Sequence, residues 1–463
     1  MTIPAFIMHA RFVLLFIVLI LPVSLIHGQT STVQSFPIKL HASGSYLVDQ
    51  RNQPFLINGD TAWSLIVQPP RKDVLTYLSD RAQKGFNLVL VNLIEHKFAT
   101  NAPANHSGHA PFTPPGNFNT PKEAYFTHAD WVIEQAARNG LVVLLAPLYL
   151  GHGCGSEGWC AEVKASSLGD MRNYGRYLGK RYKNYPNIIW LIGGDTDTVA
   201  NELTKKMREF VAGIREFDKT HLFTSHNSPE QAAIEVWPSE TWFNLNNIYT
   251  YNNAYPLALV QFNRAGAKPF FLIETYYENE RASTSLSLRR QAYWTVLSGG
   301  IAGHIFGNCP IWHFNSPSGS EFCVSGTWQS QLNSTGSTTL AYLGRLFSSR
   351  AFYKLVPDQG NFVLTAGFES GESYAAAALA SDRSFAIVYI PTNRTLTIDL
   401  SKIAGPSAHA WWFNPRTATA TFINSYKTTG STIFIPPDEY DWVLVIDNAA
   451  LNLPPPGIVT NHS

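Results

Sequence analysis

Short apolar runs alternate with amphipathic segments between Pro54 and about Ser349. The runs are continuously hydrophobic, as in Leu141-Val-Val-Leu-Leu-Ala-Pro-Leu148, which is typical of strands buried on both faces of a parallel sheet. Helical periodicity separates them, most clearly where apolar residues recur every three or four positions from Val199 to Ile214. The predicted strands are residues 55–57, 86–94, 141–148, 188–192, 222–225, 247–250, 270–273 and 303–306. Eight such units predict an α/β fold, a (β/α)8 TIM barrel over residues 37–350.

The pattern changes after Arg350. Segments such as 384–390, 410–413, 431–435 and 442–446 are short, rich in β-forming residues and separated by Gly, Pro, Asn and Asp. They predict a small antiparallel β-sandwich domain over residues 351–450. The Pro-rich remainder, residues 451–463, is expected to be a disordered tail.

The N-terminus has the pattern of a targeting signal. Arg11 precedes an apolar run from Phe12 to Ile26, which at about 15 residues is shorter than the ~20 that span a bilayer. We interpret residues 1–28 as a signal peptide cleaved after Gly28, with an uncleaved anchor as the alternative. The mature protein is then expected to be secreted and extracellular, with no membrane span.

Composition narrows the possible partners. The 34 basic and 33 acidic residues leave a formal net charge of +1. The chain therefore lacks the excess of positive charge that is typical of proteins that bind nucleic acid, and we predict no nucleic-acid partner. With 45% hydrophobic and 14% charged residues, the chain can bury a large core.

The cysteines and sequons agree with secretion. Local pairing predicts two disulfides, Cys154 with Cys160 and Cys309 with Cys323, because each pair lies within one flexible segment. Glycosylation sequons begin at Asn105, Asn333, Asn393 and Asn461, and are expected to mark surface loops.

Two carboxylates are the candidate catalytic residues. In a (β/α)8 barrel the active site forms at the C-terminal ends of the strands, where Asp195 follows the fourth predicted strand and Glu274 the seventh. One carboxyl group can protonate the leaving oxygen of a glycosidic bond while the other attacks the anomeric carbon. The alternatives are that Asp195 or Asp197 caps a helix beginning near Val199, and that Glu274 forms a structural ion pair.

Other polar and aromatic residues near strand ends are candidate substrate-binding residues. Three of them have a structural alternative: a helix cap for the aspartate, and core packing for the tryptophan and the histidine. The candidates are Asp60, Trp63, Asn92, Tyr249 and His304. His106 and His109 have the spacing of a metal pair but lie in a loop rich in Gly, Pro and Asn, so we predict no metal site. The sequence has no serine nucleophile elbow, zinc-protease motif, Walker loop or dinucleotide fingerprint, and no cofactor is predicted.

The barrel region contains four distinctive motifs: Asn58-Gly-Asp-Thr-Ala-Trp63, Arg81-Ala-Gln-Lys-Gly-Phe-Asn87, Ile189-Trp-Leu-Ile-Gly-Gly-Asp195 and Phe271-Leu-Ile-Glu-Thr-Tyr-Tyr-Glu278. Together they resemble the apiosidase-like glycoside hydrolase family over about residues 37–350. The segments Ala410-Trp-Trp-Phe-Asn-Pro-Arg416 and Asp441-Trp-Val-Leu-Val-Ile-Asp447 resemble the β module that accompanies these barrels and is named for collagen binding. That name is weak evidence, and we expect no collagen partner.

The resemblance implies a retaining enzyme that cleaves apiosyl linkages in plant cell-wall pectin. Asp195 would be the general acid/base, where related barrel glycosidases usually have Glu, and Glu274 the nucleophile. A fold does not fix a substrate, so two alternatives stay open. One is a barrel glycosidase or furanosidase for another sugar, and the other is a non-catalytic secreted carbohydrate-binding or adhesion protein.

Overall fold

A computed structural model describes residues 1–2, 35–200, 202–316, 323 and 326–459. The predicted signal peptide, beyond its first two residues, lies outside the described residues, as does the sequon at Asn461. No helix in the described part of the chain is long and apolar enough to cross a membrane.

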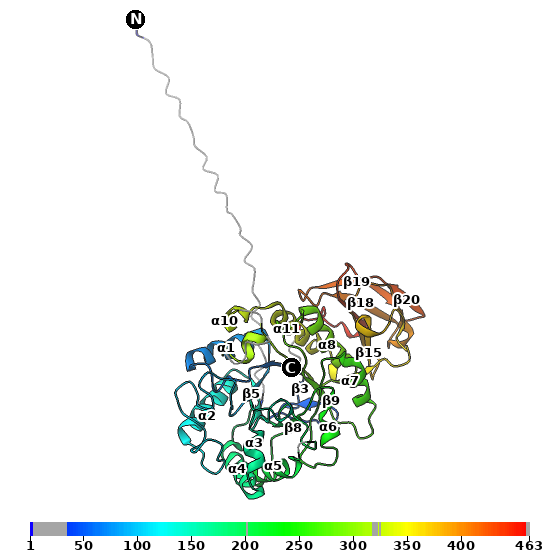
Figure 1. The fold of residues 1–463 in the computed structure, drawn as a ribbon. Coiled ribbons are helices and arrows are strands. Elements are labelled where there is room, and N and C mark those ends of the chain that lie inside the picture. The colour runs from blue at the N-terminus through cyan, green and yellow to red at the C-terminus, as the bar shows by residue number, and fades with distance from the viewer. Residues whose placement is uncertain (3–34, 201, 317–322, 324–325, 460–463) are drawn as a thin grey trace. The chain divides into compact units, whose positions relative to one another are not determined.

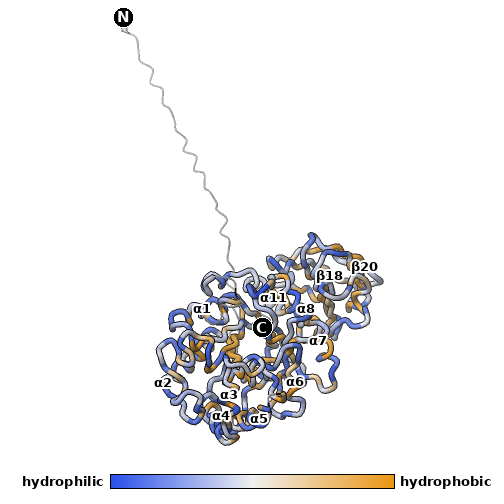
Figure 2. The backbone as a smooth tube through the Cα atoms, viewed as in Figure 1, coloured by the Kyte–Doolittle hydropathy of each residue, from blue (hydrophilic) through white to orange (hydrophobic). Residues whose placement is uncertain are grey.

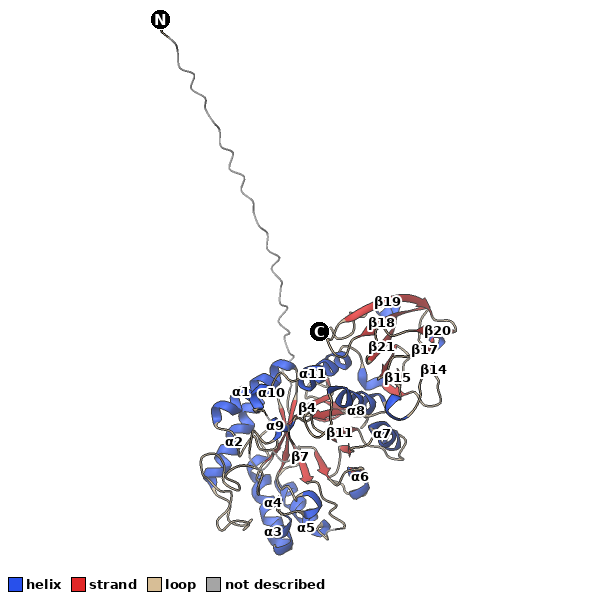
Figure 3. Ribbon diagram, turned by 45° about the horizontal axis from the view of Figure 1, so that its top comes forward, coloured by secondary structure: helices blue, strands red, loops and turns tan. Residues whose placement is uncertain are grey.

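The larger part of the described chain forms a curled parallel sheet surrounded by helices (Figure 1, Figure 3). Among the described residues, eight parallel strands follow the order β8-β7-β6-β5-β4-β12-β11-β10, and the short β9 (Gln231–Ala232) pairs antiparallel with β10. The two ends of this row meet, because Leu245 N donates to Phe223 O (3.2 Å) and Asn247 Nδ2 to Ser225 O (2.7 Å). The predicted (β/α)8 fold is therefore confirmed. The strands are β4 (Ile57–Thr61), β5 (Leu88–Asn92), β6 (Val142–Ala146), β7 (Ile188–Gly193), β8 (Phe223–His226), β10 (Asn246–Tyr249), β11 (Phe270–Glu274) and β12 (Gly303–Phe306).

The first barrel strand differs from the prediction. Pro54 and Phe55 belong instead to a small antiparallel sheet of β1 (Lys39–Leu40), β2 (Leu47–Val48) and β3 (Pro54–Phe55). The barrel strand runs on through Asn58 and Asp60, two polar residues that the apolar pattern placed after it. Both are buried, and each has a hydrogen-bond partner outside the sheet: Asn58 Nδ2 donates to Gly85 O, and Asp60 Oδ2 accepts from Tyr77 Oη.

Helices cover the outside of the sheet, while hydrophobic stretches gather inside it (Figure 2). One helix begins later than predicted: α5 starts at Thr204, and Val199 is exposed in the turn before it. Asp197 Oδ1 accepts from Val199 N and Ala200 N in that turn, so it caps the turn and not α5. The helices are α1 (Arg71–Lys84), α2 (Glu123–Arg138), α3 (Cys160–Ala165), α4 (Leu168–Tyr182), α5 (Thr204–Phe217), α6 (Ala233–Val236), α7 (Ala254–Phe262), α8 (Ser285–Leu297), α9 (Cys309–Trp312), α10 (Trp328–Gln331) and α11 (Thr335–Ser348).

The C-terminal part forms two antiparallel sheets, as predicted. One has the order β13-β15-β16-β21-β18-β19 and the other β14-β17-β20, and a separate apolar cluster, with Leu396 and Leu444 among its members, fills the space between them. The strands are β13 (Leu355–Pro357), β14 (Leu364–Ala366), β15 (Ala376–Ala380), β16 (Phe385–Ile390), β17 (Leu396–Asp399), β18 (Ser407–Phe413), β19 (Ala420–Lys427), β20 (Ser431–Phe434) and β21 (Trp442–Asn448).

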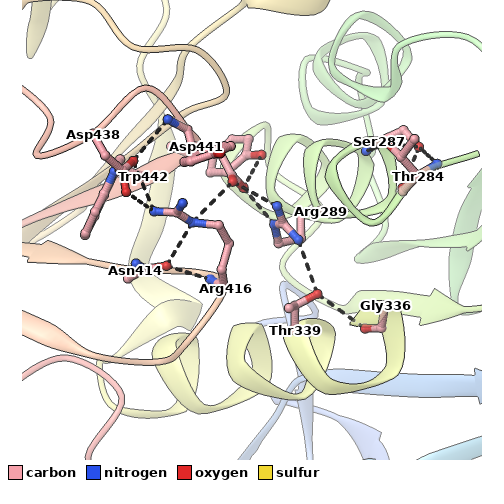
Figure 4. A network of polar contacts seen from close by, with 12 residues as sticks. Thr284, Ser287, Arg289, Gly336, Thr339, Asn414, Arg416, Asp438, Asp441 and Trp442 are labelled. Atoms are coloured by element: carbon pink, nitrogen blue, oxygen red, sulfur yellow. Dashed lines mark hydrogen bonds and ion pairs between the residues drawn. The ribbon is translucent and has the colours of Figure 1, made fainter. Parts of the chain in front are cut away.

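The β domain packs on α8 and α11 of the barrel. Tyr293 of α8 stacks on Tyr389 of β16 with ring centroids 4.5 Å apart, inside one shared apolar cluster. Arg289 of α8 forms a bidentate ion pair with Asp441 at 2.7 and 2.8 Å, and both side chains are buried (Figure 4). A buried charged pair therefore lies beside the shared apolar cluster in this contact.

Residues beyond 450 remain attached to the barrel. Arg350 Nη2 donates to Pro454 O (3.0 Å) and Gly457 N to Ser349 Oγ (2.9 Å). These contacts differ from the disorder expected for residues 451–463, because backbone groups of the tail find partners at the end of α11; residues 460–463 lie outside the described part.

Candidate active site

Asp195 follows β7 on a sharp backbone turn. Three successive residues have positive φ: Gly193 (90°), Gly194 (138°) and Asp195 (50°). A Cβ atom on Gly194 would lie 2.6 Å from Tyr149 Cδ2, so the turn needs glycine there for both conformation and space. The turn points the backbone N–H of Asp195 at His226 Nδ1, 2.8 Å away.

His226, the last residue of β8, connects the two candidate catalytic carboxylates. Its Nε2 lies 2.8 Å from Glu274 Oε2, and Glu274 is the last residue of β11. Because Nδ1 accepts from the Asp195 backbone, the hydrogen-bond network assigns the ring proton to Nε2, which donates to Glu274. One imidazole thus fixes the backbone of the first candidate and the side chain of the second.

Both carboxylates are largely withdrawn from water, with side chains 15% exposed for Asp195 and 13% for Glu274. Burial and the nearby negative charge of Glu274 together raise the pKa of Asp195 to about 6. A carboxyl group that keeps its proton to that pH is suited to proton donation, and its partner in the pair can act as a nucleophile.

Aromatic side chains form the wall around His226. The ring of Trp63 lies 5.6 Å from that of His226 and the ring of Tyr249 5.1 Å from it. Trp63 Nε1 donates to Tyr277 Oη (2.9 Å), and the hydroxyls of Tyr249 and Tyr251 are 2.6 Å apart. The structure therefore brings Trp63 and Tyr249, two predicted substrate-binding residues, close to His226, which contacts both candidate catalytic residues.

Asn92 and the neighbouring Glu95 lie at the end of β5. Strand alternation puts Asn92 on the inward side with Leu88 and Leu90, and its Nδ2 is 3.5 Å from Glu95 Oε1. Glu95 also accepts from Ser64 Oγ (2.6 Å), and burial raises its pKa to about 7. Asn92 is fully buried, and its contact with substrate stays a prediction.

Both predicted disulfides are present. Cys154–Cys160 and Cys309–Cys323 each have Cα atoms 5.3 Å apart. The first holds the loop that carries His152, whose Nδ1 lies 3.3 Å from Asp195 Oδ2, while Gly153 N donates to Asp195 O (3.0 Å). This disulfide therefore braces a loop in direct contact with the candidate acid.

Asp60 does not reach the site. Its carboxylate accepts from Tyr77 Oη (2.8 Å) and pairs with Arg81 Nη1 (3.1 Å), both on α1, and it is fully buried. It does not cap α1 either, whose N-cap is Pro70. The prediction is wrong because Asp60 lies within β4, on the face turned toward the helices.

His304 lies on the same outward face of the barrel wall. It pairs in register with Asn58, whose amide lies against Gly344 of α11. Burial lowers the pKa of His304 to about 3, so the ring stays neutral. It is a core histidine, and the prediction of a substrate contact is wrong.

The sequons differ in accessibility. Asn333 and Asn393 are exposed, as expected for surface loops, but Asn105 is fully buried and its Oδ1 accepts from Ser107 N and His109 N. Asn105 is therefore not an accessible acceptor for glycosylation in this fold.

Within the described residues, no group of three or more His, Cys, Asp or Glu is placed to hold a metal ion.

The sequence interpretation missed His226. The predicted fifth strand ended at Ser225, and His226 is the polar residue that directly follows it. Asp195 and Glu274 were selected because they follow strands in the same way. Applying that criterion to every strand would have found it.

Comparison with known families and structures agrees with the fold. The family model described as "Apiosidase-like, catalytic domain" matches residues 41–354, and the model described as "Putative collagen-binding domain of a collagenase" matches residues 356–447. A crystal structure of a glycoside hydrolase family 5 protein from Bacteroides vulgatus is 24% identical, with a TM-score of 0.79 over 89% of this chain and 93% of that one. Another structure, described as "Glycoside hydrolase", is 24% identical, with a TM-score of 0.79 over 90% of this chain and 97% of that one. Comparison with curated proteins gave no match.

Proposed function

Because the chain belongs to the family of apiosidase-like catalytic domains, matched over residues 41–354, we propose that it is a secreted retaining glycoside hydrolase. Its proposed substrate is pectin, in which it cleaves apiosyl linkages. Residues 37–350 form the proposed catalytic domain and residues 351–450 an attached β domain, for which we propose no collagen partner. Two disulfides are compatible with the proposed secretion.

The proposed reaction has two steps. In the first, Glu274 Oε attacks the anomeric carbon while Asp195 donates its proton to the departing glycosidic oxygen, which leaves a glycosyl ester on Glu274. In the second, Asp195 takes a proton from water, the water oxygen attacks the anomeric carbon, and Glu274 departs as carboxylate. Two inversions at one carbon give net retention.

A single observation carries the proposal: His226 links the two candidate catalytic residues, with its Nδ1 2.8 Å from the Asp195 backbone nitrogen and its Nε2 2.8 Å from Glu274 Oε2. An imidazole with both ring nitrogens engaged fixes the two groups relative to each other before substrate arrives. A pair fixed in this way is typical of a site in which two carboxyl groups act on one bond. The alternative role of Glu274, a structural ion pair, would not require that the same histidine also contact Asp195.

The experiment is a hydrolysis assay with the purified protein on apiose-bearing pectic oligosaccharides and on a panel of 4-nitrophenyl glycosides. The proposal predicts release of apiose and no other monosaccharide. Release of a different sugar would contradict the apiosyl specificity but would still support glycosidase activity. Binding of oligosaccharides without hydrolysis of any glycoside would contradict catalysis and favour a carbohydrate-binding protein.

A further inference from the structure

Two adjoining hollows lie where the barrel meets the β domain. Their volumes are about 400 and 620 Å³, a range typical of small-molecule sites. Tyr251, Asn253 and Glu372 line both of them. Glu372 belongs to the β domain, in the single turn Gly371–Ser373, so that domain supplies part of the wall.

The smaller hollow is lined by residues adjacent in the chain to the candidate nucleophile. Thr275 and Tyr276, which line the smaller one, directly follow Glu274. Tyr251 reaches the aromatic wall of the site through its hydroxyl contact with Tyr249 and stacks near Tyr276, with ring centroids 4.5 Å apart. A ligand chain that leaves the catalytic pair along Tyr276 therefore enters this space.

The turn that carries Glu372 is held on the barrel. Gly371 N donates to Tyr255 Oη (3.1 Å), and the Tyr255 ring stacks on Tyr374 with centroids 4.0 Å apart. Trp294 Nε1 donates to Tyr374 O (2.8 Å). Barrel residues thus fix the turn on both sides of Glu372.

Glu372 is fixed and also open to solvent. Its Oε2 lies 3.0 Å from Arg290 Nη1, yet its side chain is 75% exposed, whereas that of Arg290 is 16% exposed. The guanidinium lies 5.5 Å from the centroid of Trp294. The carboxylate keeps acceptor capacity for a ligand hydroxyl, since each oxygen has two lone pairs.

We propose that these hollows form a subsite for the sugar residues beyond the scissile bond and that the β domain completes it through Glu372. The substrate class is an oligosaccharide of several residues. Its rings lie against Tyr251 and Tyr276, and its hydroxyls donate to Glu372. This inference rests on the proposed function for the identity of the glycan, and it makes the β domain part of the substrate site instead of a separate binding module.

The test measures binding and turnover separately. In a Glu274→Gln background, which prevents turnover, calorimetry gives the Kd of an apiose-bearing pectic oligosaccharide with Glu372 intact or changed to Gln. In the active enzyme, Glu372→Gln is assayed on the same oligosaccharide and on 4-nitrophenyl apioside. Glu369→Gln is the matched control, because Glu369 is a nearby half-exposed glutamate, paired with Arg394, that lines neither hollow.

We expect Glu372→Gln to weaken oligosaccharide binding and raise its KM about tenfold, the effect of replacing a charged hydrogen-bond acceptor by a neutral amide. Turnover of the nitrophenyl glycoside and all constants of the control stay unchanged. Equal oligosaccharide affinity with and without Glu372→Gln, an equal effect of the control, or no oligosaccharide binding by the parent would overturn the subsite. Loss of affinity in a protein that hydrolyses nothing would uphold the subsite and contradict the proposed function.

Discussion

The ring of His226 accepts from the backbone N–H of Asp195 and donates to the carboxylate of Glu274, so its removal tests whether the arrangement of these two residues matters. His226→Ala deletes the acceptor for the Asp195 N–H and the donor to Glu274 Oε2. We expect kcat to fall about 10²–10³-fold, the loss typical of one preorganised hydrogen-bond donor, with KM little changed. Steady-state kinetics on 4-nitrophenyl apioside measure this split. If the folded fraction of the variant fell by the same factor as kcat, or if KM alone changed, His226 would have a purely structural role.

The protonation of Asp195 sets a pH limit on activity. Burial and Glu274 raise its pKa to about 6, so the proton needed by the leaving group is present below that pH and lost above it. The account predicts that kcat/KM on the natural glycan declines as the pH rises through about 6. Asp195→Ala should abolish this decline, and a decline of the same shape in that variant would assign it to another group.

The site could be predicted only in part, because a residue's role depends on the face it occupies. Asp195 and Glu274 stand directly after apolar runs, so sequence alone places them at the mouth of the barrel. Asp60 and His304 lie inside strands, where a shift of one residue exchanges the inward and outward faces. The start of β4 at Ile57 is set by pairing with β12 and β5, which no local pattern records.

At the scale of elements, the turn after β7 makes the position of Asp195 depend on glycine. Gly194→Ala introduces a side chain at φ 138° that meets Tyr149 at 2.6 Å and Leu150 N at 3.0 Å. We expect a loss of about 1–3 kcal/mol in the free energy of unfolding and at least about tenfold in kcat. Denaturant unfolding and kinetics on the nitrophenyl glycoside measure the two effects.

Gly85→Ala is the control for that turn. Gly85 has φ 88° at the end of α1, but a Cβ atom there would meet nothing within 4 Å, so substitution strains the backbone without a clash. It should cost about 1–2 kcal/mol in stability and leave kcat unchanged. Equal loss of kcat in both variants would mean that the turn has no special bearing on Asp195.

Sequence periodicity predicted the order of the elements better than their ends. Eight β/α units and a later β-rich region follow from hydrophobic patterning, which tertiary structure preserves. The start of α5 at Thr204 could not be predicted from this pattern, because Val199 fits the helical spacing but lies in a turn that Asp197 caps. The tail to residue 459 is held by Arg350 and Ser349, partners that its Pro-rich composition does not reveal.

At the scale of the whole molecule, a buried ion pair joins barrel and β domain. Asp441→Asn leaves the Arg289 guanidinium buried without its carboxylate, and breaking one partner of such a pair costs about 3–5 kcal/mol. We expect a corresponding fall in the free energy of unfolding, measured by denaturant titration. Glu209→Gln, in a solvent-exposed pair with Arg172, should leave the free energy of unfolding nearly unchanged. Similar losses of unfolding free energy in both variants would contradict the claim that the Arg289–Asp441 ion pair stabilises the domain contact.

The central claim is that Asp195 supplies the proton and Glu274 the nucleophile, and kinetics of two variants on two substrates test it most directly. Asp195→Ala should lose about 10²–10⁴-fold on the natural glycan but much less in the glycosylation of 4-nitrophenyl apioside, whose leaving group needs little protonation. Glu274→Ala should fail on both, because no leaving group replaces a missing nucleophile. Azide should rescue Asp195→Ala with retained anomeric configuration, and any rescue of Glu274→Ala should give inversion. Equal losses of Asp195→Ala on the two substrates, or turnover by Glu274→Ala near that of the wild type, would show that the chemistry lies on other residues.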